Sequence, residues 1–178
     1  QVLLEEYNMQ NGRAQLTEND VAKIQAEIDD RKLRQRPKLI EEVKEARAQG
    51  DLSENFEYYA AKRAKNQNES RIAYLERMLK TANIISDQSE SDEVGMNNFV
   101  EIEFLDDGSH EKYKIVTSIR GNSLKNYISN ESPLGRALVG KKVGDVCRVK
   151  VNDEVSYDVK IVAIDKSNDD SAMLNGNV

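Results

Sequence analysis

The fold is decided by residues 39–64, which read LIEEVKEARAQGDLSENFEYYAAKRA. Two helix-forming segments meet in this stretch at Gly50, and glycine is the residue that most often ends a helix. On both sides of the glycine, apolar residues recur at intervals of three and four, which is the period of an amphipathic helix. The sequence therefore predicts a helix over residues 17–49, a second helix from about residue 52 or 53 to 82, and a tight turn that makes them an antiparallel hairpin.

The first helix has a recognisable start and an expected interruption. Thr17 is a suitable N-cap residue for a helix that begins just after it. Pro37 lies inside the helical pattern, and because proline has no backbone N–H, we expect a kink or a short break there. Between the two lies a cationic stretch that we expect on a solvent-exposed face; its members are Arg31, Lys32, Arg34 and Arg36.

After residue 94 the period of the apolar residues changes from 3.6 to 2, which indicates strands. Val100, Ile102 and Phe104 alternate with glutamates, and a similar alternation returns at residues 147–151 and 155–161. The fold class is thus α+β: a two-helix coiled coil followed by a small antiparallel sheet domain with one short helix. We expect the hairpin domain at 16–85, a polar linker at 86–94, the sheet domain at 95–165 and a disordered tail at 166–178.

The composition excludes several kinds of protein. The chain has 178 residues, of which 33% are charged, and a formal net charge of -6 that is concentrated after residue 85. Its one cysteine and one histidine exclude a disulfide framework and a multi-cysteine zinc site, and leave little for histidine catalysis. No apolar run reaches the ~18 residues of a membrane span, and no signal-peptide pattern is present. We therefore expect a cytoplasmic protein that does not enter a membrane.

The turn of the hairpin carries two carboxylates at a helical spacing, Asp51 and Glu54. Two interpretations are open. Acidic residues at the start of a helix cap its free N–H groups and complement its dipole. Alternatively, the pair is half of a magnesium site, because Mg²⁺ is commonly held by one or two carboxylates together with water and phosphate. A slender hairpin has no pocket around its tip, so such a pair would complete a metal site inside another protein.

The residues around this tip resemble a known family. The resemblance begins with Gly50–Asn55 and continues with Glu57-Tyr58 and Ala60-Ala61-Lys62. It includes Arg36-Pro37 upstream and Glu45-Ala46-Arg47 before the tip. A second, independent motif lies in the sheet domain, where residues 132–138 read SPLGRAL and residues 140–146 read GKKVGDV. Together they are similar to the bacterial transcript cleavage factors of the Gre family, in the family's order and spacing, over residues 16–165.

The resemblance implies a coiled-coil N-terminal domain and an FKBP-like C-terminal domain. It also implies a transcription elongation factor that works as a monomer on RNA polymerase. The C-terminal domain would dock at the secondary channel, and the hairpin would enter it. Asp51 and Glu54 would there help hold a Mg²⁺ shared with the polymerase, which then cleaves the 3′ end of backtracked RNA. By this resemblance the chain is not itself an enzyme but stimulates the polymerase's own endonuclease activity.

Other positions follow from the same resemblance. Arg47 and Lys62 match a basic patch that faces the displaced RNA, although each also fits an ordinary solvated helix face. Tyr58 is expected either to stack on an RNA base or to pack at the tip. The residues expected to meet the polymerase are Glu131, Ser132 and Pro133, of which the Ser-Pro pair also has the pattern of a helix start.

The chain departs from the family pattern at two positions of the tip. Phe56 replaces a small residue and Tyr59 stands where the family often has histidine, so we expect a bulkier and more apolar tip.

Three alternative functions are less well supported by the residues. One is a Gre-like channel regulator without cleavage activity, which the presence of both tip carboxylates makes less favoured. A prolyl isomerase lacks support because the second half has no tryptophan and few aromatics. A plain coiled-coil adaptor would not explain the second motif.

Overall fold

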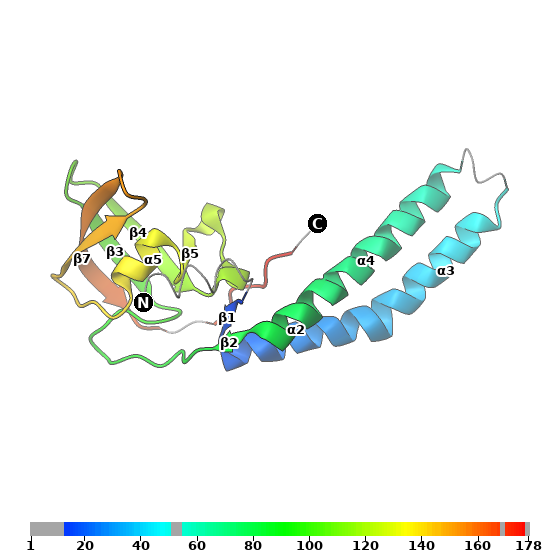
Figure 1. Cartoon of the computed structure of the whole chain (residues 1–178), viewed down its shortest axis with the longest axis horizontal. Coiled ribbons are helices and arrows are strands. Elements are labelled where there is room, and N and C mark those ends of the chain that lie inside the picture. Colours follow the sequence, from blue (N-terminus) through cyan, green and yellow to red (C-terminus); the bar gives the residue numbers. More distant parts are fainter. Residues whose placement is uncertain (1–12, 51–54, 168–169, 177–178) are drawn as a thin grey trace. The chain divides into compact units, whose positions relative to one another are not determined.

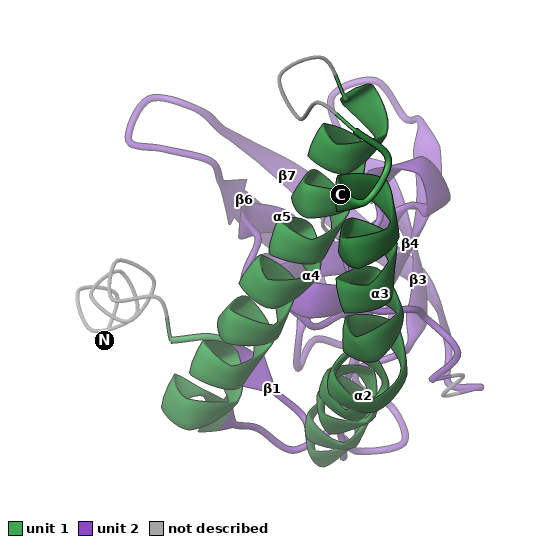
Figure 2. Ribbon diagram, turned by 90° about the vertical axis from the view of Figure 1, so that its right-hand side faces the viewer, with its two compact units in different colours: residues 1–14, 18–83, 176–178 green, residues 15–17, 84–175 purple. Residues whose placement is uncertain are grey.

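The computed structural model describes residues 13–50, 55–167 and 170–176, which divide into two compact units (Figure 2). The first unit contains residues 13–14, 18–83 and 176, and the second contains residues 15–17 and 84–175. This α+β organisation, a helical hairpin followed by a sheet, confirms the predicted fold class.

The first unit is an antiparallel hairpin whose two arms differ in regularity (Figure 1). The first arm consists of α2 (Glu18–Asp30), a π-helical segment η1 (Arg31–Gln35) and α3 (Arg36–Arg47). The second arm is one continuous helix, α4 (Phe56–Thr81), which lies against all three segments. Few apolar side chains are buried in these helices; they are Ile24, Ile28, Ala46, Ile72 and Leu75.

The predicted interruption near Pro37 takes the form of the π-helix just before it. The Arg36 N–H donates to the carbonyl of Arg31, five residues back, which is the π-helical pattern. Pro37 then occupies the first turn of α3, the part of a helix in which proline is best tolerated. The wider turn thus lets a proline follow directly on a helix without breaking the arm in two.

A two-stranded sheet lies at the base of the hairpin, formed by β1 (Gln15–Leu16) and β2 (Asn83–Ile84). The Asn83 N–H donates to the carbonyl of Ala14 at 2.9 Å, and the Ile85 N–H donates to that of Leu16 at 2.8 Å. These bonds join the segment that precedes α2 to the segment that follows α4. No helix in the described part of the chain is long and apolar enough to cross a membrane.

The second unit is built on a five-stranded sheet with the order β5-β4-β3-β7-β6. Its strands are β3 (Phe99–Phe104), β4 (His110–Val116), β5 (Tyr127–Ser129), β6 (Val146–Lys150) and β7 (Ser156–Asp165). Neighbouring strands are antiparallel except β4 and β5, which are parallel, so the prediction of a wholly antiparallel sheet was wrong at this edge. The connection between them carries two 3₁₀ turns, η2 (Ser118–Arg120) and η3 (Ser123–Lys125), which turn the chain back so that β5 begins beside Lys114 of β4.

The core of the second unit lies between the sheet and the short helix α5 (Pro133–Leu138). Alternate residues of β6 are buried, as the period of two predicts, and Cys147 is one of them. Burial raises the pKa of the Cys147 thiol, as expected for a core cysteine rather than a reactive one. The other buried members of this core are Val94, Met96, Val100, Ile102, Ile115, Leu138, Val149, Val159 and Ile161.

Candidate functional site

The hairpin tip is described up to Gly50 and again from Asn55. The predicted metal pair, Asp51 and Glu54, lies outside the described residues. On the near side α3 ends at Arg47, and the Ala48 N–H closes the last turn by donating to the Lys44 carbonyl at 3.1 Å. Gly50 follows with a φ of 121°, a backbone angle that disfavours any side chain, so the glycine is required for the turn.

Asn55 joins the two arms across this tip. Its side-chain oxygen accepts a hydrogen bond from the Tyr58 N–H at 3.0 Å, which makes Asn55 the N-cap of α4. Its amide nitrogen donates to the carbonyl of Ala46 at 2.7 Å, near the end of α3. The Asn55 side chain thus pairs with a free N–H at the start of α4 and with a carbonyl near the end of α3, one group from each arm.

The position of this cap corrects the predicted start of the second helix. The sequence pattern placed the start near residue 52 or 53, but the backbone of Asn55 is extended and the helix begins at Phe56. Asn55 itself was missed, although asparagine is among the strongest N-cap residues and stands three positions before the N–H that it binds.

The three residues predicted to bind nucleic acid come from both arms. The guanidinium carbon of Arg47, at the end of α3, lies 5.6 Å from the ring centroid of Tyr58, in the first turn of α4. A hydrogen bond from Arg47 lowers the pKa of the Tyr58 hydroxyl, and the charge of Lys62 contributes in the same direction. Arg47 and Tyr58 therefore pack on one another, which favours the packing role for Tyr58 over an open stacking platform.

Two aromatic residues beside the tip are exposed. The side chain of Phe56 is 85% exposed and that of Tyr59 is 50% exposed. The ring of Tyr59 makes an edge-on contact with that of Tyr58, with 5.5 Å between the centroids. The departures from the family pattern therefore place apolar surface directly after the acidic segment.

A groove on one face of α4 extends this surface away from the tip. It begins at Tyr59 and Lys62 and continues at intervals of three and four residues to Tyr74. Polar and cationic side chains line it between the two tyrosines, and Lys62 is the one among them that the sequence predicted as functional. The remaining lining residues, detectable from the same helical spacing, are Arg63, Asn66, Gln67, Ser70 and Arg71.

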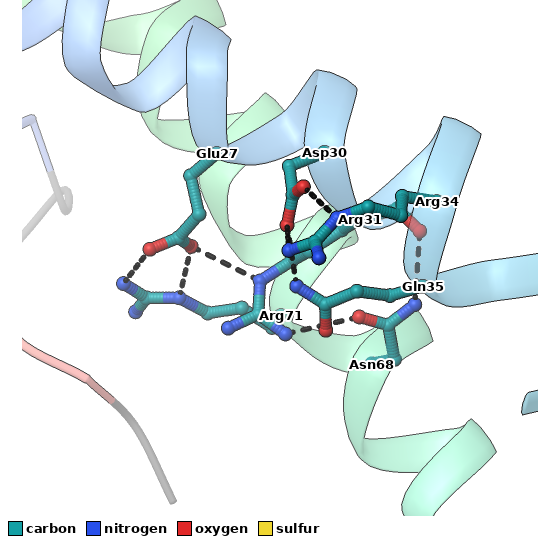
Figure 3. A network of polar contacts seen from close by, with 7 residues as sticks. All are labelled: Glu27, Asp30, Arg31, Arg34, Gln35, Asn68 and Arg71. Carbon is teal, nitrogen blue, oxygen red and sulfur yellow. Dashed lines mark hydrogen bonds and ion pairs between the residues drawn. The ribbon is translucent and has the colours of Figure 1, made fainter. Parts of the chain in front are cut away.

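A polar cluster crosses the interface between the arms beside this groove (Figure 3). Glu27 of α2 accepts hydrogen bonds from Arg71 Nε at 2.8 Å and from Arg31 Nε at 3.2 Å. Arg31 also donates to the side-chain oxygen of Asn68 at 2.9 Å, and Asn68 returns a bond to the Arg31 carbonyl at 3.3 Å. Partial burial raises the pKa of Glu27, but the hydrogen bonds and charges of the two arginines outweigh it and lower that pKa below its usual value.

The expectation that the cations at 31–36 form a solvent-exposed face was therefore wrong for most of them. Arg36 makes two bonds to Glu69 of α4, at 2.7 and 2.8 Å, and Lys32 pairs with Glu76 of the same helix. Arg31 and Arg34 pair with carboxylates of their own arm, Glu27 and Asp30. Arg31 also donates to Asn68 of the other arm, and Arg34 is the most exposed of the four cations. Because the seam contains few apolar residues, these cross-arm pairs fix which positions face one another.

The predicted docking residues lie where β5 leads into α5. Ser132 caps the helix by accepting from the Gly135 N–H at 3.1 Å, and Pro133 occupies the first turn, so the helix-start interpretation of this pair is confirmed. Glu131 accepts a hydrogen bond from the Ser118 hydroxyl at 2.8 Å. A side chain at Gly135 would come within 2.0 Å of the Ser129 carbonyl, so the glycine permits this close approach.

Comparison with known proteins identifies the family. A family model described as "Transcription elongation factor, N-terminal" matches residues 14–84, and one described as "Transcription elongation factor, GreA/GreB, C-term" matches residues 88–166. The chain belongs to the GreA/GreB family of transcription elongation factors. Members of this family act with RNA polymerase.

The Gre family assignment is supported by individual relatives. The chain is 42% identical over 151 residues to transcription elongation factor GreA of Thermotoga petrophila, which covers 84% of this chain and 97% of the relative. It is 40% identical over 154 residues to GreA of Lachnoclostridium phytofermentans, covering 86% and 96%. Among solved structures, the Thermus thermophilus protein titled GreA factor homolog 1 (Gfh1) has 26% identity over 85% of this chain and 98% of that one, with a TM-score of 0.40.

Within this Gre-family chain, the candidate metal ligands remain those at the tip. Among residues 13–50, 55–167 and 170–176, no group of three or more histidine, cysteine, aspartate or glutamate side chains could hold a metal ion. Asp51 and Glu54 supply two carboxylates, the hard oxygen donors that Mg²⁺ prefers. As a donor set they fit a magnesium ion that is also held by other ligands.

Proposed function

We propose that this Gre-family factor inserts its hairpin into the secondary channel of RNA polymerase and stimulates the polymerase to cleave the 3′ ends of backtracked RNA. The observation that carries the proposal is the construction of the tip. Asn55, which follows the acidic stretch 51–54 in the sequence, bonds to both arms of the hairpin. Arg47 and Lys62 lie on the adjoining helices α3 and α4. At ~1.5 Å per residue, the 26 residues of α4 give the arm a length of about 39 Å.

The residues of the tip have separate tasks in this proposal. Asp51 and Glu54 would provide carboxylate oxygens to a Mg²⁺ that is also held by the polymerase. When bound, that ion supplies an activated water and charge neutralisation for phosphodiester hydrolysis. Arg47 and Lys62 would neutralise phosphates of the displaced RNA, and the contact of Arg47 with Tyr58 holds the guanidinium at the end of the arm.

The chain acts in this proposal as a stimulating factor rather than as an enzyme. Two carboxylates on an arm offer neither a closed pocket nor enough ligands for a metal, so cleavage needs groups from the polymerase. The second unit would provide attachment through Glu131, Ser132 and Pro133, which β5 and α5 hold at a fixed turn.

The test uses a stalled, backtracked elongation complex with labelled RNA and Mg²⁺. Addition of the full chain is expected to shorten the RNA, whereas the chain with RNA and Mg²⁺ but no polymerase is expected to leave it intact. Binding to the polymerase without shortening of the RNA would support a channel regulator that lacks cleavage activity. Efficient cleavage in the absence of polymerase would refute the proposal and indicate a nuclease.

A further inference from the structure

Residues 170–175 pack against other parts of the second unit, beside the predicted docking residues. The Asn175 N–H donates to the Ile119 carbonyl at 2.6 Å, and the Asn175 side chain donates to the Ser118 carbonyl at 3.0 Å. Ala172 is 4% exposed. Residues 170–175, here called the C-terminal strap, form neither helix nor strand, yet these contacts hold them in place. They lie beyond the region that the family model matches, which ends at residue 166.

The strap covers a cation. Arg120, the last residue of η2, is 2% exposed, and its Nη1 pairs with the carboxylate of Asp170. The same nitrogen donates to the backbone carbonyls of Asp170 at 3.2 Å and Ala172 at 3.4 Å. A guanidinium is costly to bury without a partner of opposite charge, so Asp170 is what allows the strap to close over Arg120.

One residue connects the strap to the predicted docking surface. The backbone carbonyl of Ser118 accepts from Asn175, while its hydroxyl lies 2.6 Å from the Ser129 hydroxyl and donates to Glu131 at 2.8 Å. Arg120 is two residues further along the same 3₁₀ turn. A protein that bound Glu131 would therefore also contact the strap at the edge of the interface.

We propose that Arg120 is part of the polymerase-docking surface, as the contact for a carboxylate of the polymerase, and that Asp170 occupies this position until the polymerase displaces the strap. The inference rests on the proposed function for its partner. Exchange of one arginine–carboxylate pair for another keeps the guanidinium neutralised throughout. The strap is suited to release because it belongs to no helix or strand and its Met173 side chain is 84% exposed.

Masking of this kind makes the apparent affinity for RNA polymerase proportional to the fraction of molecules whose strap is open. With the strap open in roughly a tenth to a third of molecules, its release would strengthen binding about 3- to 10-fold. Asp170→Asn removes the charge that holds Arg120 and keeps the size of the side chain. Deletion of residues 167–178 removes the strap altogether.

The experiment measures two quantities on the full chain and these variants. Phenylglyoxal modification of Arg120, followed by mass spectrometry, reports exposure without polymerase, and both variants are expected to react faster than the wild type. Affinity for RNA polymerase is expected to rise about 3- to 10-fold in both. Arg120→Gln added to either variant is expected to abolish that rise. Asp153→Asn is the matched control, because Asp153 is a fully exposed aspartate of the same unit.

The outcomes separate this inference from the proposed function. If the wild type binds polymerase and the variants expose Arg120 without binding more tightly, the masking role is refuted and the strap is only structural. If the variants bind more weakly, the strap is itself a contact for the polymerase, which also overturns the inference. A wild type that does not bind polymerase at all refutes the proposed function, and with it the partner assigned to Arg120.

Discussion

Replacement of Asn55 tests whether the tip depends on a single bracket between the arms. Asn55→Ala removes the N-cap bond to the Tyr58 N–H and the bond to the Ala46 carbonyl. Loss of an N-cap costs about 0.5–2 kcal/mol, and a neutral hydrogen bond contributes about 0.5–1.5 kcal/mol. Because both hydrogen bonds are only partly buried, we expect the low part of the combined range, about 1–2 kcal/mol of local stability.

That free energy corresponds to opening of the first turn of α4 about 5- to 30-fold more often. Hydrogen exchange at the Tyr58 amide measures this opening directly, and exchange at buried positions of the sheet, such as Ile161, is expected to be unchanged. In backtracked complexes the variant should shorten RNA more slowly while binding polymerase as well as the wild type. The reason is that the carboxylates are present but held less firmly.

Asn55→Asp separates the two bonds. The carboxylate still accepts from the Tyr58 N–H, and its charge suits a helix start, but it cannot donate to the Ala46 carbonyl. If the bond from Asn55 to the Ala46 carbonyl matters, the Tyr58 amide hydrogen of this variant should exchange as slowly as in the wild type, yet the variant should stimulate RNA cleavage poorly. Full stimulation by Asn55→Ala, with Tyr58 exchange at the wild-type rate, would refute the bracketing role.

Three further predictions concern the tip and the seam. Asp51→Asn and Glu54→Gln should each reduce RNA shortening on the order of 10²-fold in backtracked complexes while polymerase binding is retained; near-wild-type cleavage would show that the carboxylates only cap the helix. Arg47→Ala and Lys62→Ala should weaken stimulation most at low salt, because phosphate contacts are screened by ions, and a salt-independent defect would argue against phosphate binding. The pKa of Glu27 is lowered from its ordinary value of 4.5 in the folded protein, so its contribution to stability is present above that value and is lost as the pH falls below it. Urea unfolding between pH 3 and pH 7 should therefore show a weaker acid dependence in Glu27→Gln than in the wild type, and equal slopes would contradict the assignment.

Sequence periodicity was sufficient for the main architecture because it reports burial directly. The change of period after residue 94 separates the helical unit from the sheet, and the burial of Cys147 follows from alternation alone. The Ser132–Pro133 start of α5 was predictable because its determinants are local: a hydroxyl that caps and a ring that fits the first turn.

Features that depend on contacts between distant residues were not predictable in the same way. The pairing of Arg36 with Glu69 joins positions 33 residues apart, and a cation in a polar stretch looks alike whether it faces water or a partner. The parallel pairing of β4 with β5 depends on the path of the connecting 3₁₀ turns, which strand periodicity does not encode. The tail at 166–178 has the composition of a disordered segment, and the contact of Asp170 with Arg120 carries no local signal.

The π-helical segment gives the hairpin unequal mechanical properties along its two sides. α4 is an unbroken rod, whereas the opposite arm contains five residues, Arg31–Gln35, whose hydrogen bonds follow a wider and less regular pattern. We expect bending of this arm to occur mainly at this segment, within the limits set by its side-chain pairs with α4. The 12 residues of α3 beyond the segment form a lever of about 18 Å, so a 10° bend moves its far end by about 3 Å. If the hairpin enters a channel as proposed, the adjustment of its tip there would depend more on these five residues than on the rest of the arm.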